Sequence, residues 1–212
     1  MQKIIIEDVS LQIKNAKLLD HVQMTLKSGK IYGLRGRNGS GKTVLMKCLC
    51  GFMKPTEGKI LVDGRQIGKD VDFIPDAGIM IEEPGFFPYY SGFYNLKLLA
   101  AINNKIKKQD IREALEMVGL DPYMKKHVGK YSLGMRQRLG IAQAVMENPS
   151  ILILDEPTNG LDEESVLWFR EFIKKQKEQG KIILLASHSK EDIYMLSDEV
   201  WYMEKGHVTV EK

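Results

Sequence analysis

The residues whose types and spacing point most clearly to chemistry form a glycine-rich loop in the first quarter of the chain. Residues 36–43 read GRNGSGKT and match the phosphate-loop pattern GxxxxGK(S/T). The glycines would let backbone N–H groups close around phosphate oxygens, and a helix starting after the loop would favour their negative charge. A plain glycine-rich turn is the alternative, and it is the weaker one because the complete pattern lies between a predicted strand and a predicted helix. The residues expected to hold a nucleotide are Gly36, Asn38, Gly39, Ser40, Gly41, Lys42, Thr43 and Val44.

Two side chains of this loop have separate expected roles. Lys42 would reach the β- and γ-phosphates of the nucleotide. Thr43 would hold Mg²⁺ through its hydroxyl, because this hard cation prefers oxygen ligands and substrate phosphates. The loop therefore predicts a site for a nucleoside triphosphate and its magnesium ion.

Two neighbouring carboxylates follow an apolar run that reads as a buried strand. The run ILIL at 151–154 leads into Asp155 and Glu156, and Pro157 favours an end of the strand at this point. We expect Asp155 to join the magnesium shell and Glu156 to orient and deprotonate the attacking water. Such a pair is by itself more often a solvated turn or a helix cap, and the phosphate loop is what favours the catalytic interpretation.

A histidine follows a second apolar strand, in the sequence LLASHSKED. A lone histidine in this position is more often a solvated loop residue or the neighbour of a helix cap. At a strand end in the same sheet, however, His188 could contact the γ-phosphate. Ser189 and Asp192 could equally form a capping box that starts the next helix.

The elements that must position these residues alternate between strand and helix, which predicts an α/β fold with a parallel sheet. No internal repeat or linker is present, so we expect a single domain over residues 1–212. Apolar spacing predicts strands at 4–13, 22–26, 31–34, 59–62, 151–154 and 182–186, and helices at 43–51, within 95–118 with an interruption at 104–108, at 132–147 and at 164–178.

Composition excludes several classes of protein. With 43% hydrophobic and 28% charged residues the chain is an ordinary globular protein. No apolar run approaches the roughly 18 residues that a membrane span needs, and no signal peptide begins the chain, so we expect a soluble, unexported protein. The net charge of +3 is too small to indicate a nucleic-acid partner. Cys48 and Cys50 fall on a predicted helix and are expected to be buried thiols in a reducing cytoplasm.

Taken together, these motifs resemble the ATP-binding cassette (ABC) family, the ATPase subunits of membrane transporters. The phosphate loop, the acidic pair, the run PTNGLD at 157–162 and His188 occur in the family's order. Between them, YSLGMRQR at 131–138 is similar to the family signature LSGGQ. The resemblance covers nearly the whole chain. It implies an α/β P-loop NTPase with a mainly parallel sheet core, an N-terminal antiparallel β subdomain and a helical subdomain at about 84–147.

The resemblance implies an Mg-dependent ATPase subunit that powers substrate movement by a separate membrane permease. Two cassettes would close head to tail, with each ATP between one phosphate loop and the other subunit's signature. Ser132 and Gly134 sit at a predicted helix N-terminus, which favours an anion, although a simple N-cap by Ser132 is compatible with the same sequence. By the resemblance, Asp162 couples the two sites and His188 touches the γ-phosphate. The implied location is cytoplasmic, peripheral on the inner face of the cell membrane.

Three residues depart from the family pattern. Ile13 stands where the family has an aromatic that stacks on adenine, so we expect dispersion contact and weaker base selectivity. Glu82 stands where the family has a glutamine that contacts magnesium; its charge would bind Mg²⁺ more strongly but repel the γ-phosphate, and Glu83 could take the role instead. Leu133 replaces the first signature glycine and leaves Gly134 in place.

A dense aromatic segment lies between the phosphate loop and the signature. Such density suggests a contact surface, while packing of about half of these side chains into the core is the alternative. In the family this region receives the permease's cytoplasmic helix, so a permease contact is expected around Phe86–Tyr94. The aromatic residues of the segment are Phe86, Phe87, Tyr89, Tyr90, Phe93 and Tyr94.

The strings at 81–88 and 131–138 are similar to those of cassettes that serve bacitracin and lantibiotic export or self-immunity. This narrower resemblance implies export of an antimicrobial peptide or a drug. The alternatives are a soluble ABC ATPase of translation or DNA repair and a non-hydrolysing nucleotide switch not coupled to transport. A single phosphate loop and no long insertion weigh against the first, and turnover abolished by a change at Glu156 would exclude the second.

Overall fold

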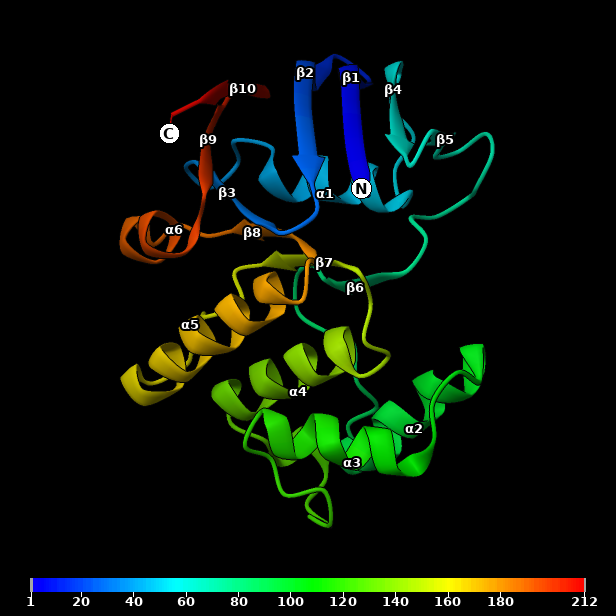
Figure 1. Cartoon of the computed structure of the whole chain (residues 1–212), viewed down its shortest axis with the longest axis vertical. Coiled ribbons are helices and arrows are strands. Elements are labelled where there is room, and N and C mark those ends of the chain that lie inside the picture. The colour runs from blue at the N-terminus through cyan, green and yellow to red at the C-terminus, as the bar shows by residue number, and fades with distance from the viewer. Residues whose placement is uncertain (1, 212) are drawn as a thin grey trace.

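The structure is a computed structural model that describes residues 2–211. The first strands of the chain form an antiparallel sheet at one end of the molecule (Figure 1). The first two strands form a hairpin, and the strand order is β2-β1-β4-β5. The predicted N-terminal antiparallel subdomain is thus confirmed. Its strands are β1 (Lys3–Ile13), β2 (Ala16–Lys27), β4 (Glu57–Val62) and β5 (Arg65–Gln66).

A second sheet of six strands forms the centre of the molecule, in the order β10-β9-β3-β8-β7-β6. Its strands pair in parallel except for β10, which runs antiparallel to β9, so the predicted mainly parallel core is confirmed. All residues of β7 and β8 are buried, as expected for strands covered on both faces. The strands are β3 (Lys30–Arg35), β6 (Ala77–Met80), β7 (Ile151–Asp155), β8 (Ile182–Ala186), β9 (Glu199–Glu204) and β10 (His207–Val210).

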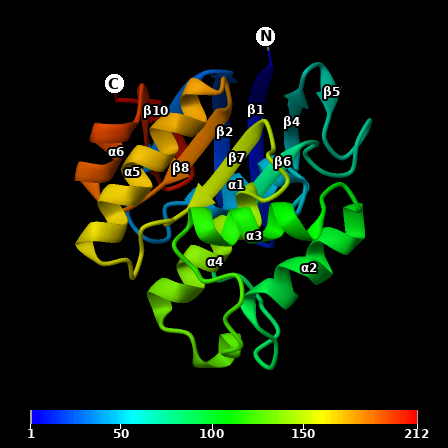
Figure 2. The same ribbon diagram turned by 60° about the horizontal axis from the view of Figure 1, so that its bottom comes forward.

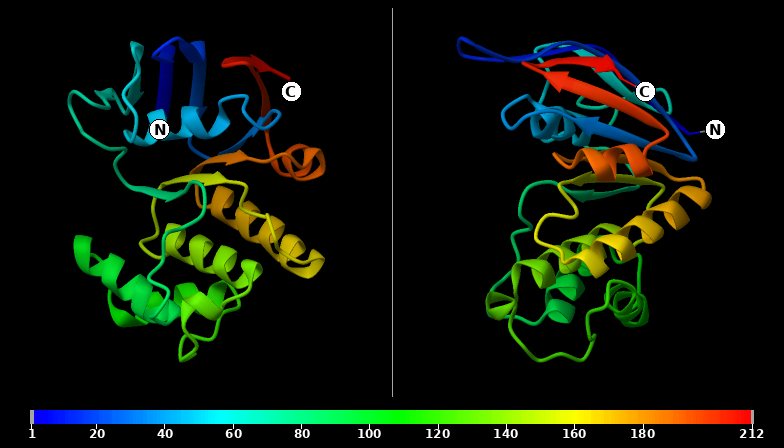
Figure 3. Two further views of the ribbon diagram at one scale, coloured as in Figure 1. Left: turned by 180° about the vertical axis from the view of Figure 1, so that it is seen from behind. Right: turned by 90° about the vertical axis from the view of Figure 1, so that its left-hand side faces the viewer.

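The helices occupy distinct places around this sheet. The first helix lies between the two sheets, as the right-hand view of Figure 3 shows. The fifth lies against the other face of the second sheet (Figure 2), and the second, third and fourth gather at the end of the molecule opposite the hairpin. Among residues 2–211, no helix has the length and apolar content needed to cross a membrane. The helices are α1 (Lys42–Cys50), α2 (Gly92–Asn103), α3 (Lys108–Met117), α4 (Leu133–Val145), α5 (Glu163–Glu178) and α6 (Lys190–Leu196).

The central sheet separates two apolar cores. On β7, Leu152 and Leu154 pack with the helices α2 to α5, whereas Ile151 and Ile153 face α1 and the antiparallel sheet. Because successive strand residues point to opposite faces, one fully apolar strand supplies both cores. This two-sided burial explains why the sequence of β7 shows no alternation.

The elements that carry the predicted site residues were placed within about two residues of their observed bounds. Helix α1 ends at Cys50, and its C-cap Gly51 adopts a left-handed conformation with φ 86°. Cys48 and Cys50 are buried free thiols on this helix, as predicted, and burial raises the pKa of each to about 12. The strands β5, β6, β9 and β10 were not expected from the sequence. The cap of α6 was left open by the sequence, and in the structure the Ser189 side chain does accept from the N–H of Asp192.

Candidate nucleotide-binding site

The phosphate loop connects the end of β3 to the start of α1, the context that the sequence predicted. Gly39 (φ 78°) and Gly41 (φ 111°) adopt left-handed conformations that residues with a Cβ rarely take. At Gly36 a Cβ would meet the carbonyl oxygen of Met203 at 2.3 Å and Ser40 Oγ at 2.6 Å. The three glycines are therefore required by backbone geometry and close approach, which excludes most other residues from these positions.

A cavity of about 610 Å³ opens beside this loop and joins it to the acidic pair. This volume lies in the range of small-molecule and cofactor sites. Ser40 Oγ is buried and has no hydrogen-bond partner among residues 2–211, so a phosphate oxygen would satisfy it. The donors and the space of the cavity thus fit a nucleotide. Its walls are formed by Lys17, Leu18, residues 38–44, Asp155, Glu156, Lys205 and Gly206.

Lys42 lies largely buried at the floor of the loop. Its Nζ donates to the carbonyl oxygens of Gly36 at 2.7 Å and Arg37 at 3.3 Å. These bonds hold the loop curled around the ammonium group, which places a positive charge where the sequence predicted contact with phosphates.

Thr43 of α1 and Asp155 of β7 are in direct contact in the wall of the cavity. Thr43 Oγ1 donates to Asp155 Oδ2 at 2.7 Å. Burial raises the pKa of Asp155, and the carboxylates of Glu156 and Glu82 raise it further, against the lowering effects of the Thr43 hydrogen bond and the Lys42 charge. A hydroxyl and a carboxylate oxygen, with excess negative charge nearby, are ligands that fit Mg²⁺.

Replacing Asp155 with Asn should raise the thermal stability of the metal-free chain at neutral pH. The folded-state pKa of Asp155 lies above its ordinary value of 3.8, so the ionised form costs stability above that value. The cost disappears as the pH falls below about 3.8, because both states are then protonated. Thermal unfolding at about pH 7 and about pH 3 should therefore show a gain that is lost in acid.

Asp198 offers a matched control for this prediction. Burial would raise its pKa, but hydrogen bonds from the Ile31 N–H and from Lys177 hold it below its ordinary value. Because ionised Asp198 stabilises the fold above 3.8, Asp198→Asn should lower the unfolding temperature at neutral pH. A loss of stability for Asp155→Asn, equal at both pH values, would contradict the role given to its burial.

Glu156 follows the last residue of β7 and turns back toward the same cavity. Adjacent residues of a strand face opposite ways, so the strand must end before both carboxylates can share one site. β7 does end at Asp155, and Glu156 has φ 49°. The structure thus brings the two carboxylates together in the manner that the sequence required.

His188 pairs with Glu156 at the edge of the cavity. The imidazole Nδ1 lies 2.8 Å from Glu156 Oε2, where its N–H donates to the carboxylate, and Ser187 Oγ donates to the same oxygen at 3.3 Å. The His188 side chain is 67% exposed. It is therefore a solvated residue and a partner of Glu156 together, which leaves its contact with a γ-phosphate a prediction.

The signature residues do not line the cavity of their own chain, within residues 2–211. Ser132 caps α4 by accepting from the Met135 N–H at 3.1 Å, so the simple N-cap is present. Asp162 likewise caps α5 through the Ser165 N–H. Within the described residues, neither these two caps nor Gly134 line the cavity. Their predicted roles need an atom supplied from outside this chain.

Two of the residues that depart from the family pattern, Ile13 and Glu82, are not among the residues that line the cavity within residues 2–211. Ile13 is 44% exposed at the turn of the first hairpin, opposite Ala16, while the next residues of β2 reach the cavity. Glu82 Oε1 accepts from Lys47 Nζ at 2.8 Å. Glu82 also raises the pKa of Asp155, so its charge acts on that carboxyl group. Adenine contact by Ile13 and metal contact by Glu82 stay predictions.

Some lining residues were not found from the sequence. Lys205 and Gly206 form the turn between β9 and β10, and Lys17 comes from β2. The apolar run VWYM before the sequence EKG and the alternating HVTV after it are strand signals that could have revealed the first two. No local signal marks Lys17, because its place depends on the packing of the two sheets.

These features define a P-loop nucleotide-binding protein of the α/β class, with its ligand cavity at the carboxyl ends of parallel strands. The family model for ABC transporters matches residues 19–159, and the chain belongs to the ABC transporter family as an ATP-binding cassette. The resemblance identified from the motifs is thereby confirmed. As a member of this family, the chain is an ATP-binding subunit of a transporter.

Similar proteins share most of the chain's length. The uncharacterized ABC transporter ATP-binding protein YybJ of Bacillus subtilis (strain 168) is 42% identical over 201 residues, covering 95% of this chain and 92% of the relative. The bacitracin transport ATP-binding protein BcrA of Bacillus licheniformis is 41% identical, covering 96% and 67%. The lantibiotic transport ATP-binding protein SrtF of Streptococcus pyogenes is 37% identical, covering 95% and 90%. The narrower resemblance to bacitracin and lantibiotic cassettes is thus confirmed.

Among solved structures, a dimeric bacterial ABC transporter cassette has the same fold. It superposes with a TM-score of 0.88 over 99% of this chain and 98% of the other, at 23% identity. A dimeric cassette in a post-hydrolysis state, bound to ADP and Pi, has the same TM-score at 22% identity. At this identity the likeness establishes the fold.

Proposed function

We propose that this chain hydrolyses ATP with Mg²⁺ and so powers substrate movement through a separate membrane permease. The observation that carries the proposal is the single cavity shared by the phosphate loop, Thr43, Asp155 and Glu156. Residues 1–212 act as one ATP-binding domain, with a helical subdomain at about 84–147. The test is phosphate release from ATP by the purified chain: turnover that stops when Mg²⁺ is chelated supports the proposal, and no turnover would contradict it.

Each residue of the cavity has a role in this reaction. The loop N–H groups and Lys42 bind the phosphates. Thr43 and Asp155 would hold Mg²⁺, with Glu82 as a further oxygen ligand, and the ion would neutralise charge on the phosphates. Glu156 takes the proton of the attacking water, while His188 fixes the orientation of its carboxylate or reaches the γ-phosphate.

A second cassette completes the site in this proposal. Ser132, at the start of α4, is exposed, and Leu133 beside it is 44% exposed. The N-terminus of a 13-residue helix favours a phosphate through its free N–H groups and its dipole. We therefore place Ser132 and Gly134 of one copy against the ATP of another, with Asp162 at the same contact, in a head-to-tail homodimer.

The segment Phe86–Tyr94 is the proposed contact for the permease. Phe86 and Phe93 pack against the helical core, whereas Tyr89 is 81% exposed, so the segment divides between core and surface. The chain that follows α3 contacts this segment, because the Val128 N–H donates to the Tyr90 carbonyl oxygen at 2.8 Å. A surface with exposed aromatic side chains fits a protein partner. Bound there, the chain would be peripheral on the inner face of the cell membrane.

The exported substrate would be an antimicrobial peptide or a drug. The support is the kind of transport named for the relatives, bacitracin for BcrA and lantibiotic for SrtF.

Replacing Tyr89 with Ala should uncouple the chain from its permease without impairing hydrolysis. Truncation of a central aromatic contact costs about 2 kcal/mol or more of binding, so membrane retention in the native host should fall more than about tenfold. Phosphate release by the isolated chain should stay within about twofold of wild type. Phe93→Ala is the comparison, since it removes a core contact and should lower stability instead. Unchanged membrane retention for Tyr89→Ala would exclude this surface as the contact.

A further inference from the structure

One buried glutamine links α4, the helix that starts at the signature, to the backbone of Glu156. Gln137 lies in the second turn of α4 and is 9% exposed. Its Nε2 donates to the Glu156 carbonyl oxygen at 2.7 Å, and that carbonyl also accepts from the Asn159 N–H at 3.1 Å. On the other side, the Glu156 N–H donates to the Ala186 carbonyl at 2.8 Å. The backbone groups of Glu156 are thus fixed by hydrogen bonds from both sides.

This fixation matters because Glu156 holds an unfavourable conformation. A glutamate with φ 49° persists only where its surroundings determine it. If Glu156 relaxed to an extended conformation, it would continue β7 and point to the face opposite Asp155. Its carboxylate would then leave the cavity. The hydrogen bond from Gln137 opposes that relaxation.

Helix α4 contacts the turn at residues 156–161 at a second point. At Gly134 a Cβ would lie 3.0 Å from the Gly160 carbonyl oxygen, so the helix and the turn are in close contact there. At Gly160 a Cβ would meet the Leu133 side chain at 2.4 Å. The first turn of α4 therefore packs on one end of the turn 156–161, and Gln137 bonds to the other end. The position of this turn therefore depends on the position of α4.

We propose that Gln137 is a positioning residue for hydrolysis, which holds the peptide of Glu156 so that its carboxylate faces the cavity. The inference rests on the proposed role of Glu156 as the base. Because α4 also carries Ser132, which we place against the ATP of a second copy, Gln137 links the partner-facing end of this helix to the carboxylate of its own chain. Binding of the signature to the partner's nucleotide is then coupled to the orientation of the Glu156 carboxylate.

A purely structural glutamine would make the same hydrogen bond, and kinetics separates the two roles. A positioning residue that acts through Glu156 changes the chemical step and leaves ATP affinity unchanged. Its effect also vanishes once Glu156 can no longer act as a base, because the two residues work as one unit. A structural residue would instead lower stability and ATP affinity together with turnover.

The test is Gln137→Met, which keeps the length of the side chain and removes the donor. We expect kcat to fall about 10- to 100-fold while the Kd for ATP stays within about twofold. In a Glu156→Gln background the same substitution should cause less than about a twofold further loss. Gln143→Met is the matched control, because Gln143 lies on the same helix but lines the cavity between α2 and β6, and its kcat should match wild type.

A second variant guards against a folding defect of the first. Gln137→Glu keeps the side-chain shape and sets an oxygen against the Glu156 carbonyl, so it should lose kcat at least as strongly. A kcat for Gln137→Met equal to that of the Gln143→Met control would overturn the inference while leaving the ATPase proposal intact. A parallel loss of ATP affinity, or a full further loss in the Glu156→Gln background, would also overturn it. A wild-type chain without turnover would overturn both.

Discussion

Replacing Glu156 with Gln is expected to lower ATP turnover by about 10³-fold and to leave ATP affinity within about twofold. The amide keeps the shape of the side chain and an oxygen for the His188 N–H, which donates to Glu156 Oε2 at 2.8 Å in the native chain. It cannot accept a proton from the attacking water, so the loss falls on the chemical step. Phosphate release and equilibrium binding of ATP measure the two quantities separately.

Glu163→Gln is the control for this substitution. Glu163 is exposed in the first turn of α5 and belongs to the same stretch of chain without lining the cavity, as far as residues 2–211 are concerned. Its turnover should match wild type. His188→Ala should lose less than Glu156→Gln, because it removes a partner of the base and leaves the base itself. If Glu156→Gln kept more than about a tenth of wild-type turnover, Glu156 would not be the base.

Replacing Lys42 with Ala is expected to weaken ATP binding by about 100-fold, which corresponds to about 2.7 kcal/mol. The ammonium group is largely buried beneath the loop, where it donates to the Gly36 carbonyl at 2.7 Å. Removing it deletes the positive charge expected at the phosphates and one bond that holds the loop curled. Titration with a fluorescent ATP analogue measures the change.

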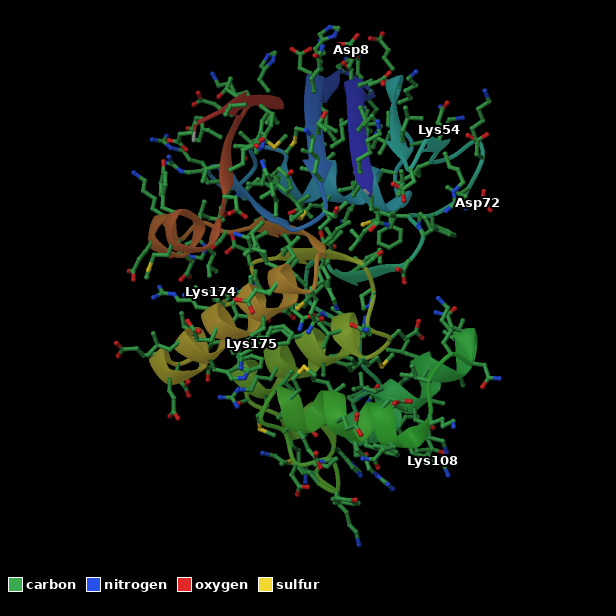
Figure 4. All side chains as sticks on the ribbon, viewed as in Figure 1. Asp8, Lys54, Asp72, Lys108, Lys174 and Lys175 are labelled. Atoms are coloured by element: carbon green, nitrogen blue, oxygen red, sulfur yellow. The ribbon has the colours of Figure 1, made fainter. Side chains whose placement is uncertain are left out.

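The control is Lys174→Ala on α5 (Figure 4), a half-exposed side chain that does not line the cavity, as far as residues 2–211 are concerned. It removes the same charge from the chain and should leave the affinity unchanged. An affinity for Lys42→Ala as high as that of this control would show that the loop binds its ligand without the lysine. That outcome would remove Lys42 from the proposed site.

The phosphate loop and the acidic pair could be predicted because their signals are local. Glycine favours the left-handed conformations found at Gly39 and Gly41. Strand β7 is buried on both faces, so its sequence is an apolar run that is easily recognised. The end of β7 before Pro157 likewise followed from adjacent residues. Where a short stretch of sequence determines its own backbone, the prediction and the structure agree.

The remaining features depend on segments that meet only after folding. The bond between Gln137 and Glu156 joins a helix to a strand end, and Lys47 pairs with Glu82 across 35 positions of sequence. Lys17 reaches the cavity because two sheets pack together around α1. No spacing rule within one element encodes such contacts, so the sequence showed the residue types without their partners.

The central claim is that each ATP is hydrolysed between the phosphate loop of one copy and the signature of another. Ser132→Asp tests the signature, because Asp keeps the N-cap of α4 but sets a negative charge against a phosphate. Lys42→Ala tests the loop. In a head-to-tail dimer of the two variants, one site combines both defects and the other site has neither.

The decisive measurement is phosphate release by an equimolar mixture of the Lys42→Ala and Ser132→Asp chains. Each variant alone should be nearly inactive. The mixture should recover about a quarter of wild-type turnover, because half of the dimers are mixed and each mixed dimer has one intact site. A mixture no more active than its separate components would contradict the shared site.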